Sequence, residues 1–101
     1  MPPLPNRINM SKPWKSKKYR EWVASLPSIY SGQHDHNVPH HFRAGWNGAG
    51  MGIKPSDLYC VSLTYREHYA FHNKHFHLDE AFVLRECLKQ IDEWLRTGGK
   101  L

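Results

Sequence analysis

The sequence predicts a small α+β domain, and three observations lead to this prediction. The chain has 101 residues, a length that suits a single domain. Hydrophobic residues make up 40% of it and charged residues 23%, which is typical of a globular protein rather than a disordered one. Stretches with helical periodicity and short β-rich stretches follow one another in the order helix, strand, strand, helix, helix.

The N-terminal region divides into an arm and a first helix. We expect residues 1–15 to form a flexible basic arm, because the first ten residues contain three prolines and the first twenty hold six basic and no acidic side chains. From Ser16 to Leu26, apolar residues recur at i, i+3, i+4 and i+7, which predicts an amphipathic helix that Pro27 ends. The apolar face consists of Tyr19, Trp22, Val23 and Leu26.

The middle of the chain predicts two strands and a helix. A first short strand is expected over residues 37–42, and a glycine-rich loop over 43–56 follows it. Residues 58–63 are rich in β-formers and predict a second strand. The next four residues, 64–67, read T-x-x-E, a capping box that opens a helix running to about Asn73.

The clearest element is a C-terminal amphipathic helix over about residues 79–97. Asp79 and Glu80 favour a helix N-terminus, and Gly98-Gly99 favours its end. The expected apolar stripe consists of Leu84, Cys87, Leu88, Ile91, Trp94 and Leu95. We expect this helix to supply much of the core, because so short a domain buries only a modest share of its surface.

The charge of the chain favours a polyanionic partner. Lys and Arg number 14 against nine Asp and Glu, which gives a formal net charge of +5 at pH 7. Lys15, Lys17 and Lys18 are the expected phosphate contacts on the first helix, and a plain solvated helix face is the alternative. No apolar run reaches the roughly 18–20 residues that a membrane helix needs, so no membrane partner is expected. The N-terminus lacks the apolar stretch of a secretory signal, which makes a cytoplasmic location the expectation.

Histidine is concentrated in one part of the chain, because all eight histidines lie between positions 34 and 77. His68 and His72 are four residues apart on a predicted helix, so they share a face with Cβ atoms about 5–6 Å apart, close enough to bind one metal ion. The alternative is two partly buried histidines on an amphipathic helix. Glu67 precedes His68, so the zinc-protease motif H-E-x-x-H is absent.

A second histidine pair, His40-His41, lies at the end of the first predicted strand. Adjacent strand residues point to opposite faces, so one imidazole can face a metal ion while the other faces a substrate. The segment 34–36, which reads His-Asp-His, is a further metal-binding candidate, for which a polar loop is the favoured interpretation. His75 and His77 are expected to face solvent. The two cysteines form no C-x-x-C pair and cannot supply a disulfide framework or a four-thiolate zinc site.

The order of these pieces is that of a ββα-metal (HNH-type) nuclease site. The motifs are His40-His41-x-Arg43, Gly48-x-Gly50-Met51-Gly52-x-Lys54-Pro55-Ser56-Asp57 and Arg66-x-His68-x3-His72, preceded by a helix ending in Trp22-Val23-x-Ser25-Leu26-Pro27. Together they resemble the small phage and prophage HNH-type nucleases related to the Ref recombination-enhancement nuclease. The resemblance spans about residues 19–73. It implies that 16–101 form one HNH-like nuclease domain, with a ββα-metal core at about 37–74 and a helix on either side.

The resemblance implies one metal site in this chain, whereas a second, structural zinc site of relatives lacks its ligands here. His40, His68 and His72 resemble the ligands of one divalent ion. Three imidazoles suit Zn, Ni or Co by softness, whereas nuclease activity is expected to use Mg or Mn. Relatives commonly carry a structural zinc on cysteines whose equivalents here are Ser28, Ser31 and Thr64. Hydroxyls are poor zinc ligands, so we expect no structural zinc, and local packing by Ile29 and Tyr30 in its place.

The resemblance also implies the catalytic and phosphate-binding residues. His41 corresponds to the general base that deprotonates a water molecule for attack on the phosphate. Asp57 stands where the central Asn of the motif usually lies, and we expect it to hydrogen-bond the backbone or to orient His41. Arg43 and Lys54 are the expected phosphate contacts.

The function that follows is a metal-dependent DNA endonuclease that hydrolyses phosphodiester bonds with a histidine general base. The resemblance implies a phage-encoded enzyme of DNA recombination or processing in the host cytoplasm, with DNA as partner and a recombinase or another phage DNA-processing protein as a further one. The first alternative is a catalytically silent nucleic-acid-binding module on a ββα scaffold, which would not need His41. The second is a small interaction protein stabilised by zinc or histidine, which metal removal would unfold.

Overall fold

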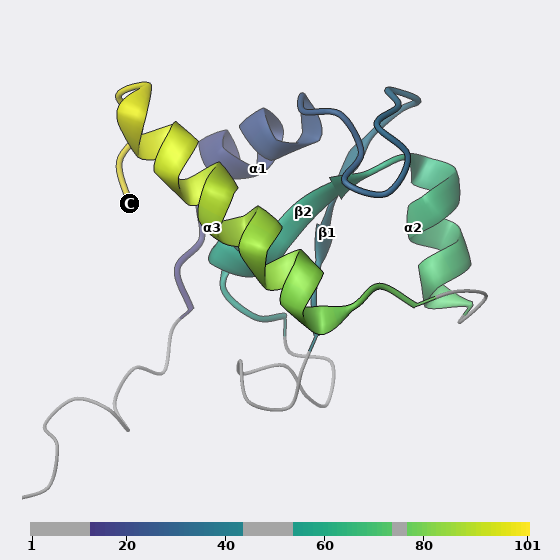
Figure 1. Ribbon diagram of the computed structural model, residues 1–101. Helices are drawn as coiled ribbons and strands as arrows, with labels where there is room; N and C mark the ends of the chain where they lie inside the picture. The colour runs from purple at the N-terminus through teal and green to yellow at the C-terminus, as the bar shows by residue number, and fades with distance from the viewer. Residues whose placement is uncertain (1–12, 44–53, 74–76) are drawn as a thin grey trace, which may run out of the picture.

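The computed structural model describes residues 13–43, 54–73 and 77–101, and it has an α+β fold, as predicted (Figure 1). Its elements are α1 (Lys17–Ala24), β1 (Val38–His41), the short 3-10 helix η2 (Asp57–Tyr59), β2 (Cys60–Leu63), α2 (Tyr65–His72) and α3 (Glu80–Arg96). In this described part of the chain, no helix is long and apolar enough to cross a membrane. Most of the predicted arm and most of the predicted loop over 43–56 lie outside the described residues.

Each helix begins at a side chain that caps it. The Ser16 hydroxyl accepts a hydrogen bond from the backbone N–H of Tyr19 at 3.1 Å. Thr64 and Glu67 form the predicted capping box at the start of α2. Asp79 caps α3 in the same way. These caps are local features of the sequence, and the observed helices therefore begin and end within about two residues of the expected bounds.

The sheet consists of β1 and β2 in antiparallel register, with Val38 opposite Leu63 and His41 opposite Cys60. All four residues of β2 are buried, whereas those of β1 are half-buried. The reason is that β2 contacts all three helices. Figure 1 shows α3 crossing the sheet while α2 stands at its side, beyond the strands. β2 is thus the centre of the domain, and the end of β1 is left partly open.

The core has two clusters, and both involve α3. Tyr19, Val23 and Cys60 form the first, against which Trp14, Trp22, Ile91 and Trp94 pack. Val61, Val83 and Cys87 form the second, against which Ile29, Phe42, Leu78 and Phe82 pack. The helices α1 and α3 are therefore joined through aromatic rings, with the ring centroids of Tyr19 and Trp94 5.3 Å apart.

The apolar stripe expected on α3 is partly wrong. Leu88 is 68% exposed and Leu95 is also exposed, whereas Gln90 is buried. The Gln90 side-chain amide donates a hydrogen bond of 2.9 Å to the backbone carbonyl of Cys60. A polar residue occupies this core position because it satisfies a buried carbonyl of β2 that would otherwise lack a partner.

Hydrogen bonds hold the loop between α1 and β1, which contains Ser28 and Ser31. The Ser28 hydroxyl donates to Glu67 Oε1 at 2.5 Å, and the Thr64 backbone N–H donates to the same oxygen at 2.9 Å. The backbone N–H of Ser31 donates to the Ser28 hydroxyl at 3.2 Å. Burial would raise the pKa of Glu67, but the hydrogen bonds from these hydroxyls and from the backbone outweigh it and lower the pKa.

Of the two residues expected to pack in this loop, Tyr30 is 56% exposed. Ile29 does pack, against the second core cluster, and its backbone N–H donates to Ser62 at 3.0 Å. A hydrogen-bond network centred on the Glu67 carboxylate holds the loop, because this carboxylate accepts both the Ser28 hydroxyl and the Thr64 backbone N–H.

Candidate functional site

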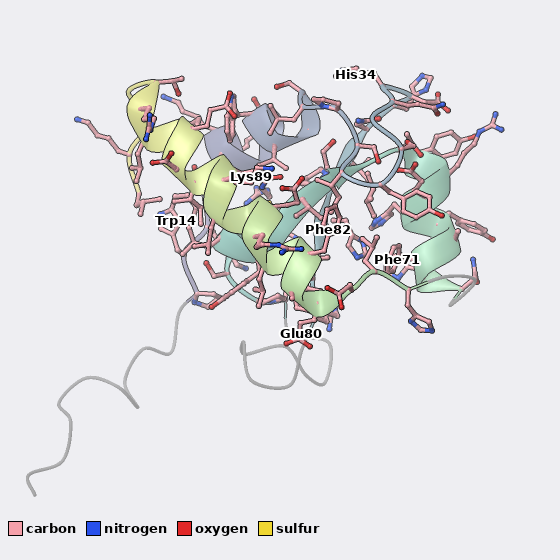
Figure 2. The ribbon with its side chains drawn as sticks, in the orientation of Figure 1. Trp14, His34, Phe71, Glu80, Phe82 and Lys89 are labelled. Carbon is pink, nitrogen blue, oxygen red and sulfur yellow. The ribbon has the colours of Figure 1, made fainter. Side chains whose placement is uncertain are left out.

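A cleft of about 630 Å³ lies between the end of β1 and α2. Seven basic or histidine side chains line it: His40, His41, Arg43, Lys54, His68, His72 and His77. Phe71 also lines it, and Figure 2 shows this residue on the side of α2 that faces the rest of the molecule. The structure thus brings the expected ligands, the expected base and the expected phosphate contacts to one cleft, although they are far apart in the sequence.

Three imidazoles meet at the centre of this cleft. The ring centroids of His68 and His72 lie 4.5 Å apart on α2, and that of His40, at the end of β1, lies 5.0 Å from His68 and 6.1 Å from His72. The Nδ1 atoms of His40 and His68 are 2.8 Å apart, a hydrogen bond in which one ring donates and the other accepts. One strand end and one helix face therefore supply the whole group.

Imidazole nitrogens are suitable donors for a metal ion, but the three rings are not oriented as ligands of one ion. Among the described residues, no three His, Cys, Asp or Glu side chains form a ready metal-binding group. Two nitrogens bound to one tetrahedral zinc ion lie roughly 3.3 Å apart, given Zn–N bonds of about 2.0–2.1 Å. The His40–His68 nitrogens are closer than that, so binding requires their hydrogen bond to open by a small rotation of the rings.

The surroundings keep the imidazoles of His40 and His68 neutral. Burial, and then the neighbouring rings of His68 and His72, lowers the pKa of His40 to about 4. Burial, followed by His72 and Lys54, also lowers the pKa of His68. A neutral imidazole has the free lone pair that a metal ion requires.

His41, next to His40 at the end of β1, also lines the cleft, and its side chain contacts Asp57. The His41 Nε2–H donates to Asp57 Oδ1 at 2.7 Å, and the two side chains are 11% and 3% exposed. Asp57 is the first residue of η2, which follows the loop and leads directly into β2, the partner strand of β1. Because a carboxylate only accepts hydrogen bonds, this contact places a proton on Nε2, and in the neutral imidazole the lone pair is then on Nδ1.

Asp57 has two further partners, both from the start of α1. Its Oδ2 accepts the backbone N–H of Ser16 at 2.7 Å and the guanidinium Nη1 of Arg20 at 2.6 Å. Burial would raise the pKa of Asp57, but the hydrogen bonds from His41, Ser16 and Arg20 outweigh it and lower the pKa. The carboxylate is therefore ionised and fully paired in the folded protein.

The structure adds two residues to the site that the sequence analysis did not place there, Arg20 and His77. Sequence reasoning did not single out Arg20, because its partner Asp57 lies 37 residues further along the chain and no local pattern joins them. His77 is exposed, as expected, but it also lines the cleft. The three lysines at positions 15, 17 and 18 are exposed near the start of α1 and are not part of the cleft wall.

The fold and this cleft define a small α+β protein with a histidine-rich site. The sequence matches a family described as protein of unknown function (DUF968) over residues 5–98, and the chain belongs to this family. No curated protein and no solved structure matches it significantly. The family description states no activity, so the function is inferred from the geometry of the site.

Proposed function

We propose that this protein is a metal-dependent DNA endonuclease of the ββα-metal (HNH) type. One observation carries the proposal: His41, whose imidazole is hydrogen-bonded to the Asp57 carboxylate, lines the same cleft as the group formed by His40, His68 and His72. The succession β1, β2, α2 supports it, since two antiparallel strands and a helix supply these side chains in the order expected of a ββα-metal core.

His41 acts as the general base. Its Nδ1 takes a proton from a water molecule, whose oxygen bonds to the phosphorus while the bond from phosphorus to the 3′ oxygen breaks. The departing 3′ oxygen takes up a proton from solvent. Asp57 keeps the Nε2 proton in place and stabilises the imidazolium that forms, as the carboxylate does in other histidine–carboxylate pairs.

His40, His68 and His72 would hold one divalent metal ion. Such an ion, when bound, supplies positive charge to the phosphate oxygens and to the leaving oxygen. Arg43 and Lys54, on the wall of the same cleft, bind the phosphate groups next to the scissile bond. The exposed lysines near the start of α1 add sequence-independent phosphate contacts.

Cleavage of plasmid and single-stranded DNA with Mg, Mn, Ni and Zn tests the proposal. We expect metal-dependent cleavage by the unmodified chain and its loss, by about 10²–10⁴-fold, in His41→Ala. The matched control is His36→Ala, because His36 is an exposed histidine whose Nδ1 also lies near an aspartate, Asp35, at 3.1 Å. His36→Ala should cleave normally. If the unmodified chain binds DNA but cleaves it with none of these metals, the protein is a silent nucleic-acid-binding module instead.

A further inference from the structure

The His41–Asp57 pair is held from outside the ββα unit, by α1. Ser16 is the N-cap of α1 and Arg20 lies one turn further on, so both reach the same carboxylate oxygen. Asp57 in turn donates its backbone N–H to the carbonyl of Trp14 at 2.9 Å. Three contacts therefore fasten the beginning of α1 to the residue that supports His41.

The contact between Asp57 Oδ2 and Arg20 fixes the direction of the other carboxylate oxygen, Oδ1. Rotation about the bond between Cβ and Cγ of an aspartate has a broad energy profile, so a single hydrogen bond to His41 would leave this angle loosely defined. With Oδ2 fixed at 2.6 Å from Arg20 Nη1, the plane of the carboxylate is set and Oδ1 faces His41 Nε2. The Arg20 side chain is only 34% exposed, which limits the competition of solvent for this ion pair.

We propose that Arg20 is a positioning residue for the proposed reaction, which acts through Asp57 to hold His41 in the Nε2–H tautomer with Nδ1 directed to the cleft. This inference rests on the proposed nuclease function. It gives α1 two roles. Lys17 and Lys18 lie between Ser16 and Arg20 and are exposed, so they are accessible for the proposed contact with DNA phosphates. The element that is proposed to bind the nucleic acid is then also the element that aligns the base.

Kinetics of Arg20→Met and Arg20→Lys test the inference. Loss of a residue that orients a reactive group typically costs about 10–100-fold in activity. We expect Arg20→Met to lower kcat by this factor with KM within twofold, and Arg20→Lys to recover part of it. The matched control is Arg96→Met, since Arg96 forms a similar ion pair of 2.9 Å with Asp92 on α3, away from the cleft. Thermal unfolding of each variant shows that it is folded.

A double-mutant cycle and a spectroscopic measurement separate positioning from general stabilisation. If Arg20 acts through Asp57, adding Arg20→Met to Asp57→Asn should leave kcat unchanged within about twofold. Additive losses would overturn the inference. Nitrogen-15 NMR of the imidazoles, recorded without metal, should show the Nε2–H tautomer of His41 in the unmodified chain and in Arg96→Met, and a tautomer mixture in Arg20→Met.

The outcomes for the two proposals are distinguishable. An unchanged kcat or an unchanged His41 tautomer in folded Arg20→Met overturns the role of Arg20, while cleavage that depends on His41 upholds the nuclease function. A tautomer change without any cleavage by the unmodified chain upholds the effect of Arg20 on His41 through Asp57 but overturns its role in a reaction.

Discussion

Asp57 is the residue at which separate segments of the chain meet. Its carboxylate is almost fully buried, and its partners come from β1, from the N-cap of α1 and from the first turn of that helix. A buried charge is tolerated only when such partners compensate for the lost hydration. The buried carboxylate is therefore stabilised only when all three segments are in place. The hydrogen bond that holds His41 thus depends on the folded state.

Acid should destabilise the protein through Asp57. Because the folded-state pKa of Asp57 lies below its unfolded value of about 3.9, the unfolded chain binds more protons at low pH. The stability that the ionised carboxylate contributes is present above about pH 4 and is lost as the pH falls through the lower, folded-state pKa. Urea unfolding measured from pH 6 downward should show this decline. The free energy of unfolding of Asp57→Asn should be lower at pH 6 and should fall less steeply as the pH is lowered. A decline as steep as that of the unmodified chain would contradict the assignment.

At the scale of elements, α1 combines a buried face with a charged one. Tyr19 and Val23 are fully buried against the sheet and α3, while lysines occupy the exposed side of its first turn. One of them, Lys17, lies 3.9 Å from Glu21, with both side chains exposed. An exposed pair of this kind contributes little stability, so the proposed phosphate contacts would cost the fold little.

Charge reversal on α1 should weaken DNA binding without sequence preference. We expect a variant with glutamate at positions 15, 17 and 18 to bind all sequences less tightly, and its affinity to depend less steeply on salt, by about 0.9 in log–log slope for each lost phosphate contact. Fluorescence anisotropy over a range of salt concentrations measures both. A control with the same charge change near the end of the chain carries Lys89→Glu, Arg96→Glu and Lys100→Glu. Equal losses in the two variants would mean that net charge alone, and not α1, is responsible.

The start of α2 depends on one carboxylate. Glu67 closes the capping box and also accepts the Ser28 hydroxyl, so it joins the helix to the loop before β1. Glu67→Ala leaves the backbone N–H of Thr64 and the hydroxyl of Ser28, both in buried residues, without this acceptor. We expect a loss of about 1–3 kcal/mol in the free energy of unfolding. Urea denaturation measures it. Glu21→Ala is the control, an exposed glutamate on α1 that should change stability by less than about 0.5 kcal/mol.

At the scale of the whole molecule, the core and the histidine group are separate. The two core clusters consist of side chains from α1, β2 and α3, and none of the three cleft imidazoles belongs to them. The histidine group is assembled only when β1 and α2 come together. The domain should therefore fold without metal, in contrast to a small protein that zinc holds together.

Metal should raise the melting temperature without being needed for folding. At a hundredfold excess over Kd, a ligand that binds only the folded state adds about 2.7 kcal/mol, which corresponds to roughly 10 °C or more in a domain of this size. We expect such an increase with Ni or Zn in the unmodified chain, a cooperative transition in the presence of a chelator, and no increase in His68→Ala. His34→Ala is the control, since His34 does not line the cleft and lies well away from Phe71 (Figure 2). Unfolding by the chelator would favour the metal-stabilised interaction protein.

The fold class, the order of α1, β1, β2, α2 and α3 and most of their ends could be predicted from the sequence, whereas the short 3-10 helix η2 was missed and takes the place of the first two residues of the strand expected over 58–63. The predicted features depend on short-range physics: Ser16, Thr64 and Asp79 cap helices within three residues of themselves, and a periodicity of 3.6 or 2 is visible in a single stretch. The histidines gathered at the cleft were also identified from their spacing and from the resemblance of the motifs, since two of them already share one helix face.

Only the tertiary structure decided which residues support that site and which face of α3 is buried. Arg20 and Asp57 are 37 residues apart, and Gln90 and Cys60 are 30 apart, so neither pair leaves a periodic or local pattern in the sequence. Amphipathic patterning predicted Leu88 as buried and could not anticipate that Gln90 would be preferred there. The physical reason is that a buried carbonyl or carboxylate requires a hydrogen-bond partner, and which side chain supplies it depends on how the elements pack in space.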